Sequence, residues 1–354
     1  MSNTSSNFLQ KLGVPNENFI EVEPKYINKV FISGITEGYG FLNHTKKLME
    51  DINPKKLYPI VDGFLQDKND FLPIPPENVY VDARLNFWWV WNVLWNFNPK
   101  YRTYDDEIDN PMTGSKGDWG HNGTIKSFIK PLTSKRKHKF MCLNNNNKTG
   151  REIFIDEISD KLIEENWISG YFSDRVGLKN IDKVDPNNPA PPNMFYSKIF
   201  FEHYDRCYIQ PFFESPGLND GFTDKMLMVT EKSCIPFLLG NIAIPMNLFY
   251  VSEYEKLGFK FVKNINGVSI NETIEWDIEK YKMDSDIKSN DNFPTKFLRN
   301  NIKSIEKINN ESTLDDLEKV WLENIDIIEH NRELVIKYMT STECLDDLKE
   351  WLEK

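Results

Sequence analysis

Apolar and polar positions in the second half of the chain predict strands and helices in turn. Residues 139–143 form a short apolar run that predicts a strand, and residues 151–165 place apolar side chains at helical spacing. Residues 208–213 predict another strand, in which Pro211 is disfavoured at a central hydrogen-bonding position. Strands that alternate with helices in this way predict a parallel sheet with right-handed crossovers.

The segment from 228 to 246 has the clearest local signals. Thr230 is a good N-cap residue, and Gly240 follows where a left-handed residue would end the helix. Residues 242–246 then form an apolar run that is typical of a buried parallel strand. The pattern therefore predicts a capped helix followed by an interior strand.

Two charged residues, Glu231 and Lys232, fall on the first turn of this predicted helix. Free backbone N–H groups and the helix dipole favour an anion there. A carboxylate and an ammonium beside such a site suit a ribose hydroxyl and a phosphate. The alternative is that Glu231 complements the dipole and Lys232 is solvated.

The first half shows a similar but weaker alternation. Residues 29–34 and 79–82 predict strands, and residues 41–51 predict a helix after the first of them. The aromatic run 87–97 predicts a buried element rather than a sugar-stacking surface. Residues 101–126 are rich in Gly, Asp and Asn, which predicts a long loop of the functional or mobile kind.

These elements predict an α/β protein with two Rossmann-like domains that face each other across a cleft. The polar, basic stretch 131–139 is interpreted as the linker between them. The predicted division is an N-terminal α/β domain at 1–135, a Rossmann-like domain at 136–300 and C-terminal helices at 301–354. Apolar residues at helical spacing support the helical tail from about residue 313 onward.

Composition narrows the function classes. The chain has 54 acidic and 43 basic residues and a formal net charge of −11, which argues against nonspecific nucleic-acid binding. No CxxC spacing occurs, so zinc and disulfide frameworks are not expected and the thiols should be buried and reduced. No apolar window is long enough to span a membrane, and the first residues lack a signal core. A cytoplasmic location is expected, in the host cell if the protein is viral.

Three segments of the second half should meet where the parallel strands end. The loop from Asn144 to Arg151 follows one strand, Glu214 ends a second, and Thr230 opens a helix near a third. Ligands of such sheets bind beyond the carboxyl ends of the strands. Arg151 offers a planar fork for phosphate, and Lys232 adds a point charge.

The same segments resemble the donor half of α-1,3-fucosyltransferases. The ordered stretches are KFMCLNNNNKTGREIFIDEI, FFES and MVTEKSCIPFLLGNIAIPM. The chain is still more similar to phage- and virus-encoded glycosyltransferases, in which a Thr-Glu-Lys helix precedes a segment like NLFYVSEYEKLGF. The resemblance covers residues 139–262. Ser215 replaces the family's Asn and Met228 replaces its Tyr, which leaves the donor sugar and nucleotide open.

The resemblance implies a hexosyl- or fucosyl-type glycosyltransferase that uses a nucleotide sugar as co-substrate and a glycan or other hydroxyl acceptor. It implies that Arg151 and Lys232 neutralise the donor diphosphate. It also implies that Glu231 binds the ribose and Glu214 faces the donor sugar. The N-terminal domain would then be the acceptor side. The predicted donor-binding residues are Asn144, Arg151, Thr230, Glu231 and Lys232.

Other signals are weaker. Asp118 and His121, in a polar loop, are the candidates for the base that takes the acceptor proton, with an ordinary turn as the alternative. No Asp-x-Asp motif follows an apolar strand, so no metal ion and no other cofactor are implied.

Two rival functions stay open. One is a glycan- or protein-binding module without turnover. The other is a viral enzyme that glycosylates DNA bases through the basic run 135–139.

Overall fold

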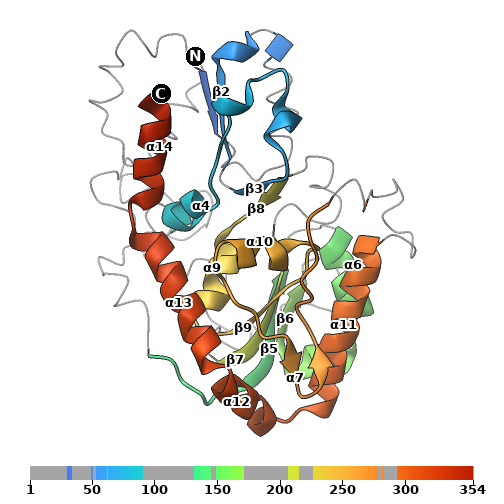
Figure 1. Ribbon diagram of the computed structural model, residues 1–354. Coiled ribbons are helices and arrows are strands. Elements are labelled where there is room, and N and C mark those ends of the chain that lie inside the picture. The colour runs from blue at the N-terminus through green and yellow to red at the C-terminus, as the bar shows by residue number, and fades with distance from the viewer. Residues whose placement is uncertain are drawn as a thin grey trace, which may run out of the picture.

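The computed structural model describes residues 30–33, 49–50, 53–61, 63–90, 131–144, 149–170, 206–214, 226–277, 281 and 293–353. In this part of the chain the protein is mixed α/β, with two parallel sheets and a run of C-terminal helices (Figure 1). The predicted α/β class is therefore confirmed. The finer arrangement, two Rossmann-like domains facing across a cleft, stays a prediction, as does the division at 1–135, 136–300 and 301–354.

The first sheet has three parallel strands with β2 in the centre. Leu57, Ile60 and Val61 of β2 are fully buried, so this strand supplies the core of the sheet. The strands predicted at 29–34 and 79–82 are confirmed. The strands of the first sheet are β1 (Val30–Ser33), β2 (Leu57–Val61) and β4 (Tyr80–Val81). The short 3-10 helices beside it are η2 (Pro54–Lys56), η3 (Lys68–Phe71) and η4 (Pro76–Asn78).

The aromatic run begins in a helix, α4 (Arg84–Trp89). Phe87 and Trp88 of this helix are buried, which confirms the prediction of a buried element for the part that the structure describes. The predicted helix at 41–51 is described only at Met49 and Glu50, which are helical. The predicted loop at 101–126 lies outside the described residues.

The second sheet has four parallel strands in the order β6-β5-β7-β9. Side chains alternate between its faces: Phe140 and Cys142 of β5 pack in one core cluster and Met141 in another. The strands predicted at 139–143, 208–213 and 242–246 and their parallel pairing are confirmed, whereas the edge strand β6 was not predicted. The strands are β5 (His138–Asn144), β6 (Trp167–Gly170), β7 (Cys207–Phe212) and β9 (Ile242–Pro245).

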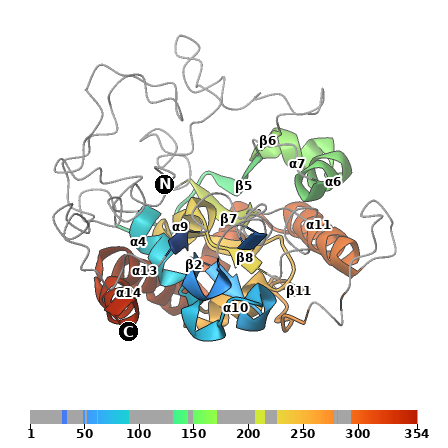
Figure 2. The ribbon, with the colours of Figure 1, turned by 90° about the horizontal axis from the view of Figure 1, so that it is seen from above.

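Helices cover both faces of the second sheet. On one side lie α6 (Thr149–Glu157), α7 (Asp160–Glu165) and α11 (Phe293–Glu311). On the other lie α9 (Glu231–Leu238) and α13 (Ile325–Thr340), as Figures 1 and 2 show from two directions. The carboxyl ends of the strands therefore open at one edge, between the first turns of α6 and α9.

A two-stranded antiparallel ribbon joins the halves. It pairs β3 (Gly63–Leu65) with β8 (Met226–Met228), just before the Thr230 helix. One core cluster accordingly combines Phe64 and Phe87 from the first half with side chains of α9 and α10 (Tyr250–Lys256). The small hairpin of β10 (Asn264–Ile265) and β11 (Val268–Ser269) follows α10.

The helical tail is confirmed. Thr313 opens α12 (Leu314–Glu323) with a capping box to Asp316, and the chain ends in α14 (Glu343–Glu353). Figure 1 shows α14 beside the first sheet, so the two ends of the described chain lie on the same part of the molecule. The sequence did not mark the start of α11, which runs across the predicted boundary between residues 300 and 301.

The single helix predicted at residues 151–165 is two helices in the structure. Residues 151–165 divide into α6 and α7 at Ser159, whose side chain caps α7 by accepting from the Leu162 N–H. Glu306 of α11 stabilises the break, because its carboxylate accepts from the Ser159 N–H at 2.6 Å and from its hydroxyl at 2.9 Å. A contact from more than 140 residues away thus ends a helix that local spacing would continue.

Pro211 lies near the end of its strand. This residue lies in β7, an interior strand, and is paired in register with Ile244 of β9. The pairs that join β7 to β5 end at Ile209, so the proline sits past that pairing and near the end of the strand. A missing N–H is tolerated at such a position.

The stretch 131–139, interpreted as a linker, is partly built into the second sheet and its core. Its last two residues belong to β5, and Arg136 is only 6% exposed. The Arg136 guanidinium donates to the carbonyls of Cys207, Leu239 and Gly240 at 2.6 to 3.0 Å and lies over the Trp321 ring. Gly240 has the predicted left-handed backbone, with φ +68°, and a Cβ there would lie 2.5 Å from Leu132.

Candidate functional site at the carboxyl edge

Arg151 is held at the start of α6, directly beyond β5. Its side chain is buried, with the residue 3% exposed, and one terminal nitrogen donates to the Phe213 carbonyl at 3.2 Å. Phe213 follows the last residue of β7, the neighbouring strand. The fork that the sequence offered for phosphate therefore also ties α6 to the end of β7.

Glu214 is the hub of this edge. The residue is 1% exposed, and its carboxylate accepts from the Thr230 N–H at 3.1 Å, from the Thr230 hydroxyl and from the Tyr254 hydroxyl at 3.2 Å. Its own N–H donates to Asn247 at 3.0 Å. Buried carboxylates are tolerated when they are bonded in this way. The geometry makes Glu214 a positioning residue for α9, whereas the resemblance implied that it faces the donor sugar.

The Thr230 helix begins as predicted. The Thr230 hydroxyl oxygen accepts from the Lys232 N–H at 3.3 Å and lies 3.4 Å from the Lys232 ammonium. Lys232 is half-buried, so its charge is held near the first turn. For Glu231 only the backbone is described, in the first turn of α9.

Tyr254 is the electrostatic partner of Glu214. Burial, and then the negative charge of the Glu214 carboxylate, raise the pKa of the Tyr254 phenol well above its usual value. The phenol therefore stays protonated at neutral pH, and its hydrogen bond to Glu214 holds α10 to the carboxyl edge. The backbone just before α10 is strained, because Phe249 has φ +73°, a left-handed conformation that bulky residues rarely adopt.

The structure thus brings Arg151, Glu214, Thr230 and Lys232 together in one connected polar edge. Asn144 is the last residue of β5, at the same edge, and is paired in register with Gly170. Asp118 and His121 lie outside the described residues. Sequence reasoning missed the anchors Asn247 and Tyr254, which appeared only inside the segment of family resemblance and have no local signal of a link to Glu214.

Two side chains of the basic run 135–139 are bonded within the protein, whereas Lys135 and Lys137 are exposed. The Arg136 guanidinium is turned into the core, as described above. The Lys139 ammonium donates to the Asn309 carbonyl at 2.6 Å. Two of the charges that the DNA-modifying alternative needed are therefore engaged inside the protein.

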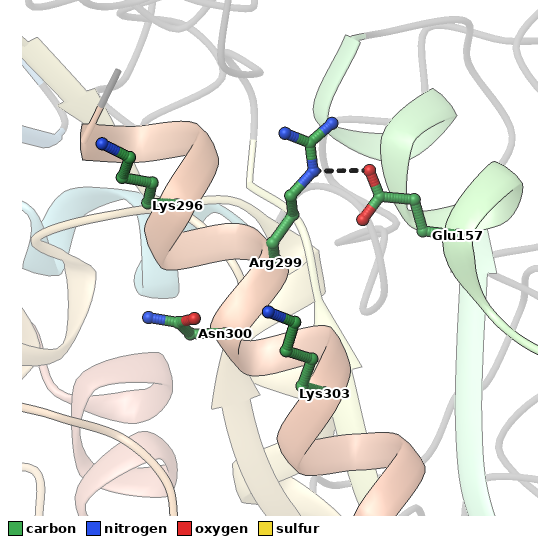
Figure 3. A pocket seen from close by; sticks show the side chains of 5 residues that line it. All are labelled: Glu157, Lys296, Arg299, Asn300 and Lys303. Carbon is green, nitrogen blue, oxygen red and sulfur yellow. Dashed lines mark hydrogen bonds and ion pairs between the residues drawn. The ribbon is translucent and has the colours of Figure 1, made fainter. Parts of the chain in front are cut away.

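A second polar feature lies between α11 and the end of α6. It is a hollow of about 490 Å³, here called the α11 hollow, and Figure 3 shows its side chains. It is lined by Glu157, Lys296, Arg299, Asn300 and Lys303. The signal that could have revealed it is the spacing of the three cations along one face of a helix, at i, i+3 and i+7.

All four cysteines are buried, as the sequence predicted, and none forms a disulfide in the structure. Among the described residues, no three His, Cys, Asp or Glu side chains are grouped as metal ligands would be. None of the helices in that part of the chain has the length and apolarity needed to cross a bilayer. Comparison with protein-family models, with curated proteins and with solved structures gives no match, so a functional assignment rests on the residues described above.

Proposed function

We propose that the protein is a glycosyltransferase that moves a sugar from a nucleoside diphosphate sugar to a hydroxyl acceptor. The observation that supports this is the convergence of two cation-bearing helix starts at one sheet edge. Arg151 lies in the first turn of α6 and Lys232 in the first turn of α9. Both helices begin where the parallel strands end, the usual place for ligands of such sheets. Helix N-termini and cations together favour a diphosphate.

The two cations have different roles in this proposal. Negative charge grows on the diphosphate as the sugar leaves, and positioned cations lower the energy of that transition state. Lys232, half-buried beside Thr230, contacts the diphosphate directly. Arg151 is buried beneath the edge, where it fixes the start of α6 and adds positive potential. These side chains take the part that a metal ion plays in other glycosyltransferases.

The remaining residues divide into positioning and reacting groups. Glu214 accepts from Thr230 and Tyr254 and so fixes the start of α9 against α10. Glu231 binds the ribose, in keeping with the family resemblance. Asp118 and His121 remain the predicted candidates for the base that takes the acceptor proton.

Thermal unfolding with a panel of UDP, GDP and CMP tests the proposal. A ligand at a hundred times its dissociation constant stabilises the folded state by about 2.7 kcal/mol, so one nucleotide should raise the melting temperature clearly. No shift from any of the three would contradict the proposal. Mass spectrometry of the product after incubation with the matching nucleotide sugar then separates a transferase from a binding module, which would bind the nucleotide without hydrolysis or transfer.

A further inference from the structure

The α11 hollow gathers positive charge in a chain of formal net charge −11. Among the described residues, Lys296, Arg299 and Lys303 line it together with Glu157 and Asn300. Lys296 and Lys303 are exposed, and the Arg299 side chain is 26% exposed. Three cationic side chains that solvent can reach therefore lie at one place on the described surface.

The direction of these cations is fixed by the opposite side of α11. Phe297, Leu298 and Ile302 are buried in the core clusters, which prevents the helix from rotating about its axis. Lys296, Arg299 and Lys303 follow one another at i, i+3 and i+7, so they share the outward face. Figure 3 shows them along one side of α11, with α6 across the hollow.

Arg299 is held in place from across the hollow. Its Nε donates to the Glu157 carboxylate at 2.6 Å, and Figure 3 shows the two terminal nitrogens turned away from that carboxylate. A guanidinium that is already oriented loses less side-chain entropy when it binds an oxyanion. Asn300 adds an amide that can donate to a polar ligand.

From this geometry we propose that the α11 hollow is a binding site for the phosphate group of a small molecule. The hollow of about 490 Å³ is open to solvent and exceeds what one phosphate fills, so a phosphate bound there leaves room for the rest of a small molecule. Planar guanidinium and ammonium groups are the side chains that recognise phosphate oxygens. Glu157 is six residues beyond Arg151 on α6, about 9 Å along the axis, so the site is separate from the carboxyl edge. It does not depend on the proposed glycosyltransferase activity.

Calorimetric titration with inorganic phosphate at low ionic strength tests this site. The background is Lys232→Gln, which removes the ammonium of the carboxyl edge. Adding Lys296→Gln and Lys303→Gln should weaken phosphate binding about tenfold, since two exposed charge-assisted contacts are lost. Glycerol phosphate serves as a second probe: tighter binding than inorganic phosphate identifies a phosphate ester as the natural ligand, and equal binding identifies free phosphate.

The matched control is Lys307→Gln in the same background. Lys307 is an exposed lysine one turn further along α11, outside the hollow and 4.0 Å from Glu311. It should leave the phosphate affinity unchanged. Equal affinity in the Lys296/Lys303 variant and in the control would overturn the proposal. Loss of all phosphate binding in Lys232→Gln alone would also overturn it, because phosphate would then bind only at the carboxyl edge.

Discussion

The two parallel sheets are completed by different parts of the chain. At the carboxyl edge of the second sheet, the central contact is buried and joins nearby segments: Glu214 accepts from Thr230, sixteen residues later. The first sheet is closed by α14 from the far end of the chain. Arg84 donates to Asp347, 263 residues away, at 2.6 Å, and the Trp351 indole donates to the Glu77 carbonyl at 3.0 Å.

The difference concerns how strongly each region is fixed. The Glu214 carboxylate is inaccessible to water, so each hydrogen bond to it counts fully and its loss would leave buried donors unpaired. Asp347 is 54% exposed, and such ion pairs are weakened by solvent and salt. The carboxyl edge should therefore be rigid, whereas α14 should open at lower free energy.

Removing the Glu214 carboxylate should have the largest effect. In Glu214→Ala the Thr230 N–H, the Thr230 hydroxyl and the Tyr254 phenol lose a buried acceptor, which should lower the free energy of unfolding by about 3 kcal/mol or more. Urea denaturation monitored by circular dichroism measures this.

Tyr254→Phe is the matched control, because it deletes one donor and keeps the ring among its aromatic neighbours, Phe64, Phe237 and Phe259. It should cost about 1 kcal/mol. If Glu214→Ala cost no more than Tyr254→Phe, the carboxylate would not be the hub and the contrast between the two regions would fail.

The ion pair at α14 should have the smallest effect. A double-mutant cycle of Arg84→Gln and Asp347→Asn should give a coupling free energy below about 1 kcal/mol that declines as salt is added. A coupling above about 2 kcal/mol that salt does not change would mean that this contact is effectively buried. The two regions would then be fixed to a similar degree.

The separation of interacting residues along the sequence explains which features could be predicted. The strands β5, β7 and β9, the Thr230 cap and the left-handed Gly240 depend on neighbouring residues and were predicted, whereas the edge strand β6 was not. The break at Ser159 and the burial of Arg136 depend on α11 and on carbonyls more than 60 residues away, which no local pattern encodes.

In the candidate site, too, the features that depend on distant contacts were not predicted. The order of segments predicted that Arg151, Glu214 and Lys232 meet at one edge, because strand direction fixes where loops emerge. The roles of their side chains were less predictable. Glu214 is turned inward toward Thr230 and Tyr254, and the latter is 40 residues away in the sequence. Which way a carboxylate points depends on packing that spacing alone does not specify.

Nucleotide affinity of Lys232→Gln is the most direct test of the proposed donor site. Arg151 is buried, so its replacement would also cost stability, whereas the half-buried Lys232 can be changed with little effect on unfolding. Calorimetry with the best-binding nucleoside diphosphate should show affinity reduced by about ten- to a hundredfold, the loss of one charge-assisted contact of about 1.5–3 kcal/mol. Lys256→Gln, which removes an exposed lysine on α10, should bind like the unmodified protein. Unchanged affinity in Lys232→Gln would contradict the donor-site assignment.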